Sequence, residues 1–251
     1  MVSIDPFIQN TTTRQITEQK GEFAVLEYNK TTGFAAADPE RAFYLSKMGI
    51  RKKQVMIQLN NTECQLQAGA MQMMLGNIQA STGVQGVGGL VASMFSARAT
   101  GETAIKPRYG GQGFVILEPT WKFILLEDLS AWGGSMTTDD GMFLACSGGI
   151  QVGTAMRQNI SSAVAGGEGL FSPMFTGQGI VALESPLPRD ELIEIELNND
   201  TVKIDGNNAV AWTSTLQFTV ERVTRTLIGS AASGEGLVNT YRGTGKILMA
   251  P

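Results

Sequence analysis

The chain contains no histidine, the side chain that titrates near neutral pH and the commonest metal ligand in proteins. Ser-His-Asp catalysis, Cys-His catalysis and the usual zinc hydrolase sites therefore cannot be built from this chain alone. Carboxylate and lysine chemistry remain open. The sequence favours a protein that is not an enzyme, and it implies no cofactor.

Cysteine, charge and long apolar runs are also scarce. Cys64 and Cys146 lie in apolar surroundings without a C-x-x-C spacing, so we expect buried free thiols. Charged residues make up 17% and the net charge is −4, which disfavours general nucleic-acid binding. The longest uncharged apolar stretch, GVGGLVASMF from Gly86, is about half as long as a membrane-spanning helix. Since no signal-peptide pattern is visible either, we predict a cytoplasmic protein without a transmembrane segment.

Glycine and strand-like alternation are abundant. Thirty glycines predict many tight turns between short strands. Helical periodicity is limited to GGLVASMFSARA from Gly88 and DPERAFYLSKMG, in which Asp38 is the expected N-cap and Pro39 lies in the first turn. The segments that alternate as β-strands do are FAVLEY from Phe23, QVMIQL from Gln54, GFVILE from Gly113, GIVALE from Gly179, LIEIEL from Leu192, TVKID from Thr201 and TLQFTVERV from Thr215.

One phrase occurs three times, as GETAIKPRYGGQGFVILE, GEGLFSPMFTGQGIVALE and GEGLVNTYRGTGKILM. Its glutamates, Glu102, Glu168 and Glu235, are 66 and 67 residues apart. A fixed period predicts one supersecondary unit in several copies. We therefore expect a single body of three units, with an additional N-terminal strand segment at residues 1–30. The units are residues 31–120, which include an insertion at 81–99, residues 121–186 and residues 187–251.

Each copy also carries a G-x-G triplet between two apolar runs. These glycines are expected to bracket hairpin turns, where positive φ or close backbone approach is needed. A dinucleotide fingerprint would need a third glycine and a following helix. Asp139, Asp140 and Asp205 also precede glycines, and Asp-Gly pairs favour turns over a cation site. The triplets are Gly111 and Gly113, Gly177 and Gly179, and Gly243 and Gly245.

Three blocks of this sequence resemble a bacterial family of uncharacterised proteins: LQAGAMQMMLGNIQ, GGEGLFSPMFTGQGIVALES, and TVKIDGNNAVAW followed by SGEGLVNTYRGTGKILM. That family is related to a fungal mitochondrial-biogenesis factor of the altered-inheritance-of-mitochondria type. The resemblance spans residues 54–249. It implies a fold like that of the tryptophan RNA-binding attenuation protein, with tandem antiparallel β-sandwich units of jelly-roll character. It brings no catalytic residues, and the basic motif with which the attenuation protein reads RNA has no repeated counterpart here.

The three repeated glutamates are the sharpest candidate site. If the units pack around a pseudo-threefold axis, Glu102, Glu168 and Glu235 could form a ring that binds a hard cation such as Ca²⁺. The alternative, which we prefer, is that each carboxylate accepts hydrogen bonds at a strand entrance and fixes a turn. Unpaired buried carboxylates would repel one another and raise their own pKa values.

Two other segments allow alternative readings. Arg51, Lys52 and Lys53 form the only dense basic cluster, and a solvated turn is favoured over contact with an anionic partner. The insertion at 81–99 is glycine-rich at its start and apolar at its end. It could be a lid, an oligomer contact or simple core cover.

Three function classes follow. We prefer a non-catalytic structural or protein-interaction protein. The alternatives are a small-ligand or metal-binding module with sites between repeats, and a carboxylate-dependent enzyme. Because β units must hide their strand edges, we also expect self-association into a homo-oligomer, with a trimer as the assumed state.

Overall fold

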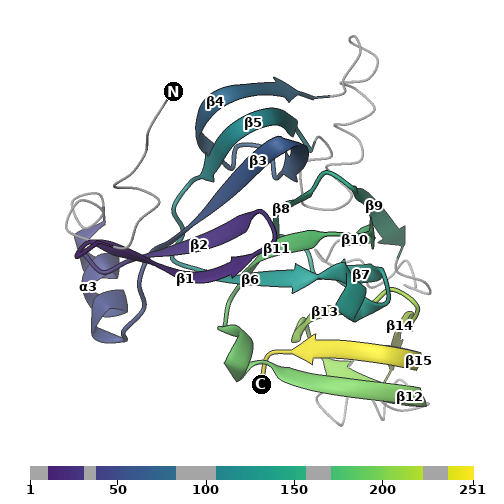
Figure 1. The fold of residues 1–251 in the computed structure, drawn as a ribbon. Helices are drawn as coiled ribbons and strands as arrows, with labels where there is room; N and C mark the ends of the chain where they lie inside the picture. Colours follow the sequence, from purple (N-terminus) through teal and green to yellow (C-terminus); the bar gives the residue numbers. More distant parts are fainter. Residues whose placement is uncertain (1–10, 31–37, 83–105, 157–170, 223–236) are drawn as a thin grey trace.

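A computed structural model describes residues 11–30, 38–82, 106–156, 171–222 and 237–251, which form two antiparallel sheets (Figure 1). The eight-stranded sheet contains β1 (Arg14–Lys20), β2 (Phe23–Tyr28), β3 (Lys53–Leu66), β4 (Met71–Ser81), β5 (Arg108–Leu117), β6 (Phe123–Asp128), β8 (Phe143–Ser147) and β11 (Ile180–Ser185). The seven-stranded sheet contains β7 (Ser135–Thr138), β9 (Ile150–Met156), β10 (Phe171–Gly177), β12 (Ile193–Asp205), β13 (Ala209–Thr213), β14 (Gln217–Arg222) and β15 (Leu237–Met249). The expected all-β class is confirmed.

The described helical structure is short. Helix α3 (Pro39–Lys47) begins where the sequence predicted, because the Asp38 side chain accepts a hydrogen bond from the Arg41 amide and proline occupies the first turn. The two 3₁₀ helices are η1 (Leu129–Trp132) and η2 (Arg189–Glu191). Within the described ranges, no helix is long and apolar enough to cross a membrane.

The same strand pairing occurs in three successive segments, which we call first (β3 to β5), middle (β6 to β11) and last (β12 to β15). In the first, β5 lies between β3 and β4. In the middle, β11 lies between β6 and β8, while β10 lies between β7 and β9. In the last, β15 lies between β12 and the pair β13 and β14. One backbone hydrogen bond of 2.7 Å recurs in all three segments, from Glu118 to Ala70, from Glu184 to Met142 and from Ala250 to Asn208.

Neighbouring segments are joined edge to edge. The end of β3 pairs with β8, which joins the first segment to the middle one. In the same way, β7 pairs with β13 and joins the middle segment to the last. The N-terminal part adds β1 and β2, two strands where one was expected, and β2 pairs with the beginning of β3.

The turn prediction for the G-x-G triplets is wrong in two segments. The first triplet lies inside β5 and the last lies inside β15, so both strands continue through their glycines. In the middle segment, Gly177 ends β10 and Gly179 precedes β11. There the chain passes from one sheet to the other, because β10 and β11 belong to different sheets.

Close backbone approach explains why the continuous strands need glycine. Gly111 and Gly113 have φ values of 132° and 151°, a region that L side chains rarely adopt. A Cβ atom would lie 2.1 Å from the Asn77 carbonyl oxygen at Gly111 and 1.9 Å from the Leu75 carbonyl oxygen at Gly113. The glycines therefore allow β4 to pack closely against a bent β5. The turn prediction failed because both a bent strand and a turn need glycine at such positions.

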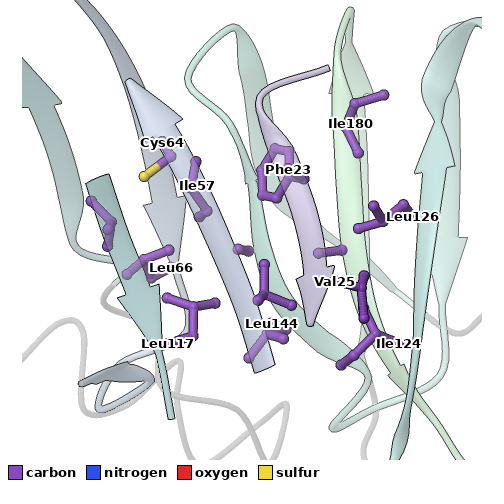
Figure 2. Close-up of a cluster of buried hydrophobic side chains, with 14 of the residues drawn as sticks. Phe23, Val25, Ile57, Cys64, Leu66, Leu117, Ile124, Leu126, Leu144 and Ile180 are labelled. Atoms are coloured by element: carbon purple, nitrogen blue, oxygen red, sulfur yellow. The ribbon is translucent and has the colours of Figure 1, made fainter. Parts of the chain in front are cut away.

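Apolar clusters form the core of the described residues, and two of them join neighbouring segments. The cluster in Figure 2 combines residues of the first and middle segments with Phe23 and Val25 of β2, so that Ile57 and Leu66 face Leu126, Leu144 and Ile180. A second cluster, which includes Trp132, Phe143, Phe175, Val210 and Leu248, connects the middle segment to the last. The third belongs to the last segment, where the Trp212, Phe218 and Tyr241 rings lie 5.1–5.5 Å apart. The joints are thus packed cores.

Candidate functional site

A pocket of about 300 Å³ lies at the joint between the first and middle segments. One wall is the turn between β3 and β4 at residues 67–70, and the other includes Gly141, Phe143 and Leu144 around the start of β8. Glu118 and Glu184, which follow the apolar runs of β5 and β11, complete the lining. The pocket therefore lies between two segments of the chain.

The two carboxylates of the pocket have polar partners. Glu118 accepts a hydrogen bond of 3.3 Å from the Gln72 Nε2 atom, and Glu184 accepts one of 2.7 Å from the Lys122 ammonium. Glu184 is the more buried of the ion pair, with 21% of its side chain exposed against 51% for Lys122. The pocket can therefore offer carboxylate oxygens to a cation or to a hydrogen-bond donor.

A lysine and an aromatic ring lie on the same side of the joint. The Lys106 ammonium lies 4.6 Å from the centroid of the Phe143 ring, within the range of a cation–π contact, and donates to the Gln67 side chain. Lys106 thus contacts two residues that line the pocket, Phe143 and Gln67. The pocket combines two carboxylates with apolar side chains such as Phe143 and Leu144.

Several polar side chains that the fold buries bind other parts of the fold. The Glu127 carboxylate accepts one hydrogen bond from Trp132 Nε1 at 3.0 Å and another from Arg189 Nε at 3.1 Å. Gln65 Nε2 donates to the Ile150 carbonyl at 2.6 Å and so ties β3 to β9. Gln54 Nε2 donates to the backbone of β5 at 2.6 Å. These groups stabilise strand packing.

Both thiols are free and buried, as the sequence predicted. Burial raises the pKa of Cys64 to about 12 and raises that of Cys146 as well. A thiol with such a raised pKa carries almost no thiolate at neutral pH, so it is a poor nucleophile. Cysteine chemistry is therefore disfavoured at both positions.

The basic cluster is engaged by neighbouring side chains. Arg51 and Lys53 lie 3.9 and 3.5 Å from the carboxylate of Glu27. The Lys52 ammonium lies 5.4 Å from the centroid of the Trp121 ring, and burial lowers its pKa, followed by the charge of Arg41. The expected solvated turn is not what the structure shows, because Arg51 and Lys52 lie in the link after α3 and Lys53 begins β3 with only 11% of its side chain exposed. Binding of an anionic partner stays a prediction.

The other predicted site residues lie in turns or outside the described ranges. Asp139 and Asp140 precede β8 and Asp205 ends β12, each close to a positive-φ glycine, which fits the Asp-Gly turns. Glu102, Glu168 and Glu235 lie outside the described residues, as do the helix expected from Gly88 and most of the insertion at 81–99. Within the described ranges, no cluster of three or more acidic or cysteine residues could hold a metal ion.

Sequence reasoning missed the pocket, although a signal for it was present. Glu118 and Glu184 occupy the same position of the repeated phrase, as the last residue of GFVILE and of GIVALE. In the last copy the corresponding residue is Ala250. The carboxylate pair is thus specific to the first joint.

These features define a class of protein: an all-β protein with curled antiparallel sheets and a pocket at an internal joint. The chain belongs to the family described as Mitochondrial biogenesis AIM24, whose model matches residues 47–251. It is 30% identical over 191 residues to an uncharacterised protein of Streptococcus pyogenes serotype M6, which covers 73% of this chain and 75% of that protein. It also resembles a crystal structure of a protein from Streptococcus pyogenes, with a TM-score of 0.59 and 25% identity over 80% of this chain and 88% of that chain. The family resemblance expected from the sequence is confirmed.

Proposed function

We propose that this chain is a non-catalytic structural or protein-interaction protein, built from three copies of one β unit related to the attenuation-protein fold. The observation that carries the proposal is the use of buried polar groups: Glu127, Gln54 and Gln65 bind strands and rings of the fold itself. The recurring strand pairing of the first, middle and last segments supports the three-copy origin. The two free thiols are compatible with a reducing compartment, which supports a cytoplasmic location.

Edge pairing supports association as the mode of action. Both internal joints are made by one strand edge that binds another, at β3 with β8 and at β7 with β13. Extended edges present unpaired N–H and C=O groups that can bind another chain in the same way. A protein whose parts join by their edges is suited to join other proteins by its remaining edges.

A ligand screen by thermal unfolding tests the non-catalytic proposal. We expect the melting temperature to change by less than about 1 °C when Ca²⁺ or free amino acids are added. A ligand present at about 100 times its Kd would stabilise the fold by roughly 2.7 kcal/mol, which is a rise of about 5–10 °C for a chain of this size. Such a saturable rise would overturn the proposal in favour of a ligand module.

The pocket at the first joint favours a second candidate function, binding of a small polar or cationic ligand. Its volume of about 300 Å³ is at the lower end of the usual range for ligand sites. Glu118→Gln and Glu184→Gln remove the two carboxylate charges without changing side-chain size. If the thermal screen finds a ligand, these variants should abolish its effect, whereas Glu196→Gln on the exposed part of β12 should leave it unchanged. A shift that survives both pocket variants would exclude this site.

A further inference from the structure

The two internal joints have the same register. At the first joint, Gln65 of β3 is paired with Cys146 of β8. At the second, Thr137 of β7 is paired with Trp212 of β13. A backbone hydrogen bond also lies on either side of each paired stretch. At the first joint, Gly148 N donates to Glu63 O at 2.8 Å and Gln67 N donates to Leu144 O at 2.8 Å. At the second joint, Ser214 N donates to Ser135 O at 3.3 Å and Asp139 N donates to Val210 O at 3.1 Å. The joint is therefore a repeated interface.

The equivalent strands at the two ends of the molecule have no such neighbour among the described residues. In the last segment, Lys203 of β12 corresponds to Gln65 and Thr137. Each of the three is paired with the residue that lies three positions before the first glycine of its triplet. In the first segment, Met74 of β4 corresponds to Cys146 and Trp212. Each of these three is paired with the residue that lies two positions after the second glycine of its triplet. Across the described ranges, β12 pairs only with β15 and β4 only with β5.

One chain cannot join its own two ends. Figure 1 shows β4 at the top of the molecule and β12 at the bottom, with the middle segment between them. Both edges carry half-buried apolar side chains, Met73 and Leu75 on β4 and Val202 on β12, at the border of an apolar cluster. Met74 is 44% exposed. Each edge thus alternates apolar side chains that are buried or half-buried with exposed ones, and the two edges lie at opposite ends of the molecule.

We propose that β12 of one chain pairs with β4 of a second copy of this chain and repeats the internal joint between molecules. In this register Lys203 lies opposite Met74, and Val202 and Ile204 lie opposite Leu75 and Met73. Two backbone bonds close the joint, from Gly76 N to Thr201 O and from Asp205 N to Gln72 O, as at the internal joints. The proposal deepens the proposed function, on which it rests, by naming the partner and the surface.

The interface is heterologous, since each copy contributes a different edge. Such contacts form an open series of molecules, or a ring where the rotation closes. A ring of three would be the trimer that the sequence suggested. The arrangement also distinguishes this interface from a two-fold dimer, in which the same edge would meet itself.

End-blocked variants test the proposal. Lys203–Met74 corresponds to a hydrogen-bonded pair, because the closing bonds lie two residues before and after it. Met74→Pro therefore blocks the β4 edge and Lys203→Pro blocks the β12 edge, since proline has no N–H. In light scattering over a concentration series, the unaltered chain should exceed monomer mass. Each variant alone should be a monomer, and an equal mixture should form a 1:1 dimer that does not grow.

Milder variants guard against a folding defect and test the register. Met74→Lys opposes Lys203 with a like charge and should weaken association about threefold to fivefold. Met74→Glu, which places an opposite charge against Lys203 and leaves the Lys203–Glu221 ion pair intact, should instead strengthen association. Ile193→Lys, at a 43% exposed position outside the pairing, should have no effect. A monomeric unaltered chain, dimerisation by either blocked variant alone, or indifference to the charge introduced at Met74 would overturn the interface. A monomeric chain would still leave the proposed function, which also admits a different protein as partner.

Discussion

Strands in equivalent positions differ in burial according to what lies beside them. All five residues of β8 and of β13 are buried, and each of these strands has a neighbour on both sides. Strand β4 has the same place in its segment, yet it contains no fully buried residue. Cys146 has no exposed surface, whereas its equivalent Met74 is 44% exposed. The two faces of β8 pack into two apolar clusters and both of its edges are paired, whereas only one edge of β4 is paired among the described residues.

The unjoined strand β12 has a different kind of support. Lys203 lies 3.6 Å from Glu221 of β14, and Lys246 of β15 lies 3.6 Å from Glu194. Exposed ion pairs contribute about 0–1 kcal/mol each, while a buried leucine-sized side chain contributes about 1.5–3 kcal/mol. The exposed ion pairs of β12 therefore add little to the apolar packing of Leu197 and Ile204 in the cluster of the last segment, and they are sensitive to salt.

The largest expected effect is on the rate of thiol labelling, compared between the folded and the urea-unfolded chain. Cys64 and Cys146 both lie in joined strands with no exposed surface, and burial raises the pKa of both thiols. Labelling with a thiol reagent at pH 8 should be slower than in urea by a factor on the order of 1000 or more, since it requires unfolding. The free thiols of the urea-unfolded chain provide the reference rate, and rapid labelling in the native state would show that the first joint opens locally.

Truncation of a core leucine should be costly at a joint and mild at an end. Leu66→Ala removes a fully buried side chain of β3 next to β8 and should lower the free energy of unfolding by about 2–5 kcal/mol. Leu75→Ala, in the half-buried β4, should cost less than about 1.5 kcal/mol. Urea titration measures both. Equal losses would mean that β4 is as well packed as the joint.

Substitution by alanine should lower the free energy of unfolding more at a glycine inside a bent strand than at a glycine in a turn. Gly113→Ala places a Cβ atom against the Leu75 carbonyl oxygen at a φ of 151°, and we expect a loss of about 2–3 kcal/mol from strain and lost pairing. Gly69→Ala, in a turn where nothing lies within 4 Å of the new atom, should cost about 1 kcal/mol. If urea unfolding gives the reverse order, the bend does not depend on the close approach.

The smallest expected effect is the loss of the Glu221–Arg242 interaction of the last segment in acid, measured on the free energy of unfolding. Hydrogen bonds from Arg242 lower the pKa of Glu221 to about 2, from a value of 4.5. A lowered folded-state pKa means that the contribution is present above pH 4.5 and is lost as the pH falls toward 2. Glu221→Gln should therefore reduce stability by about 0.2–1 kcal/mol at pH 7 and by nothing measurable at pH 2. A variant difference in melting temperature that does not depend on pH would contradict this account.

Local patterns predicted the elements better than their connections. The alternation in FAVLEY coincides with β2, and Asp38 with Pro39 marks the start of α3. The apolar surroundings of Cys64 and Cys146 predicted their burial. The G-x-G prediction failed in β5 and β15 because a glycine signals an unusual φ or a close contact, and both turns and bent strands provide them. The pocket carboxylates Glu118 and Glu184 were recognisable only as one position of a repeat.

The sequence by itself determined the strands, the positions that require glycine and the recurrence of one phrase, because these depend on side-chain periodicity and backbone sterics within a few residues. Tertiary structure decided which edges are joined, which cluster each strand enters and where a pocket remains between Glu118 and Glu184. The apolar patterns of β4, β8 and β13 do not predict which strand is paired on both edges, because each of the three has apolar side chains that can be buried. Whether an edge is paired depends on a strand distant in the sequence, as β3 binds β8 and β7 binds β13. Whether a face is buried depends on the clusters that pack against it.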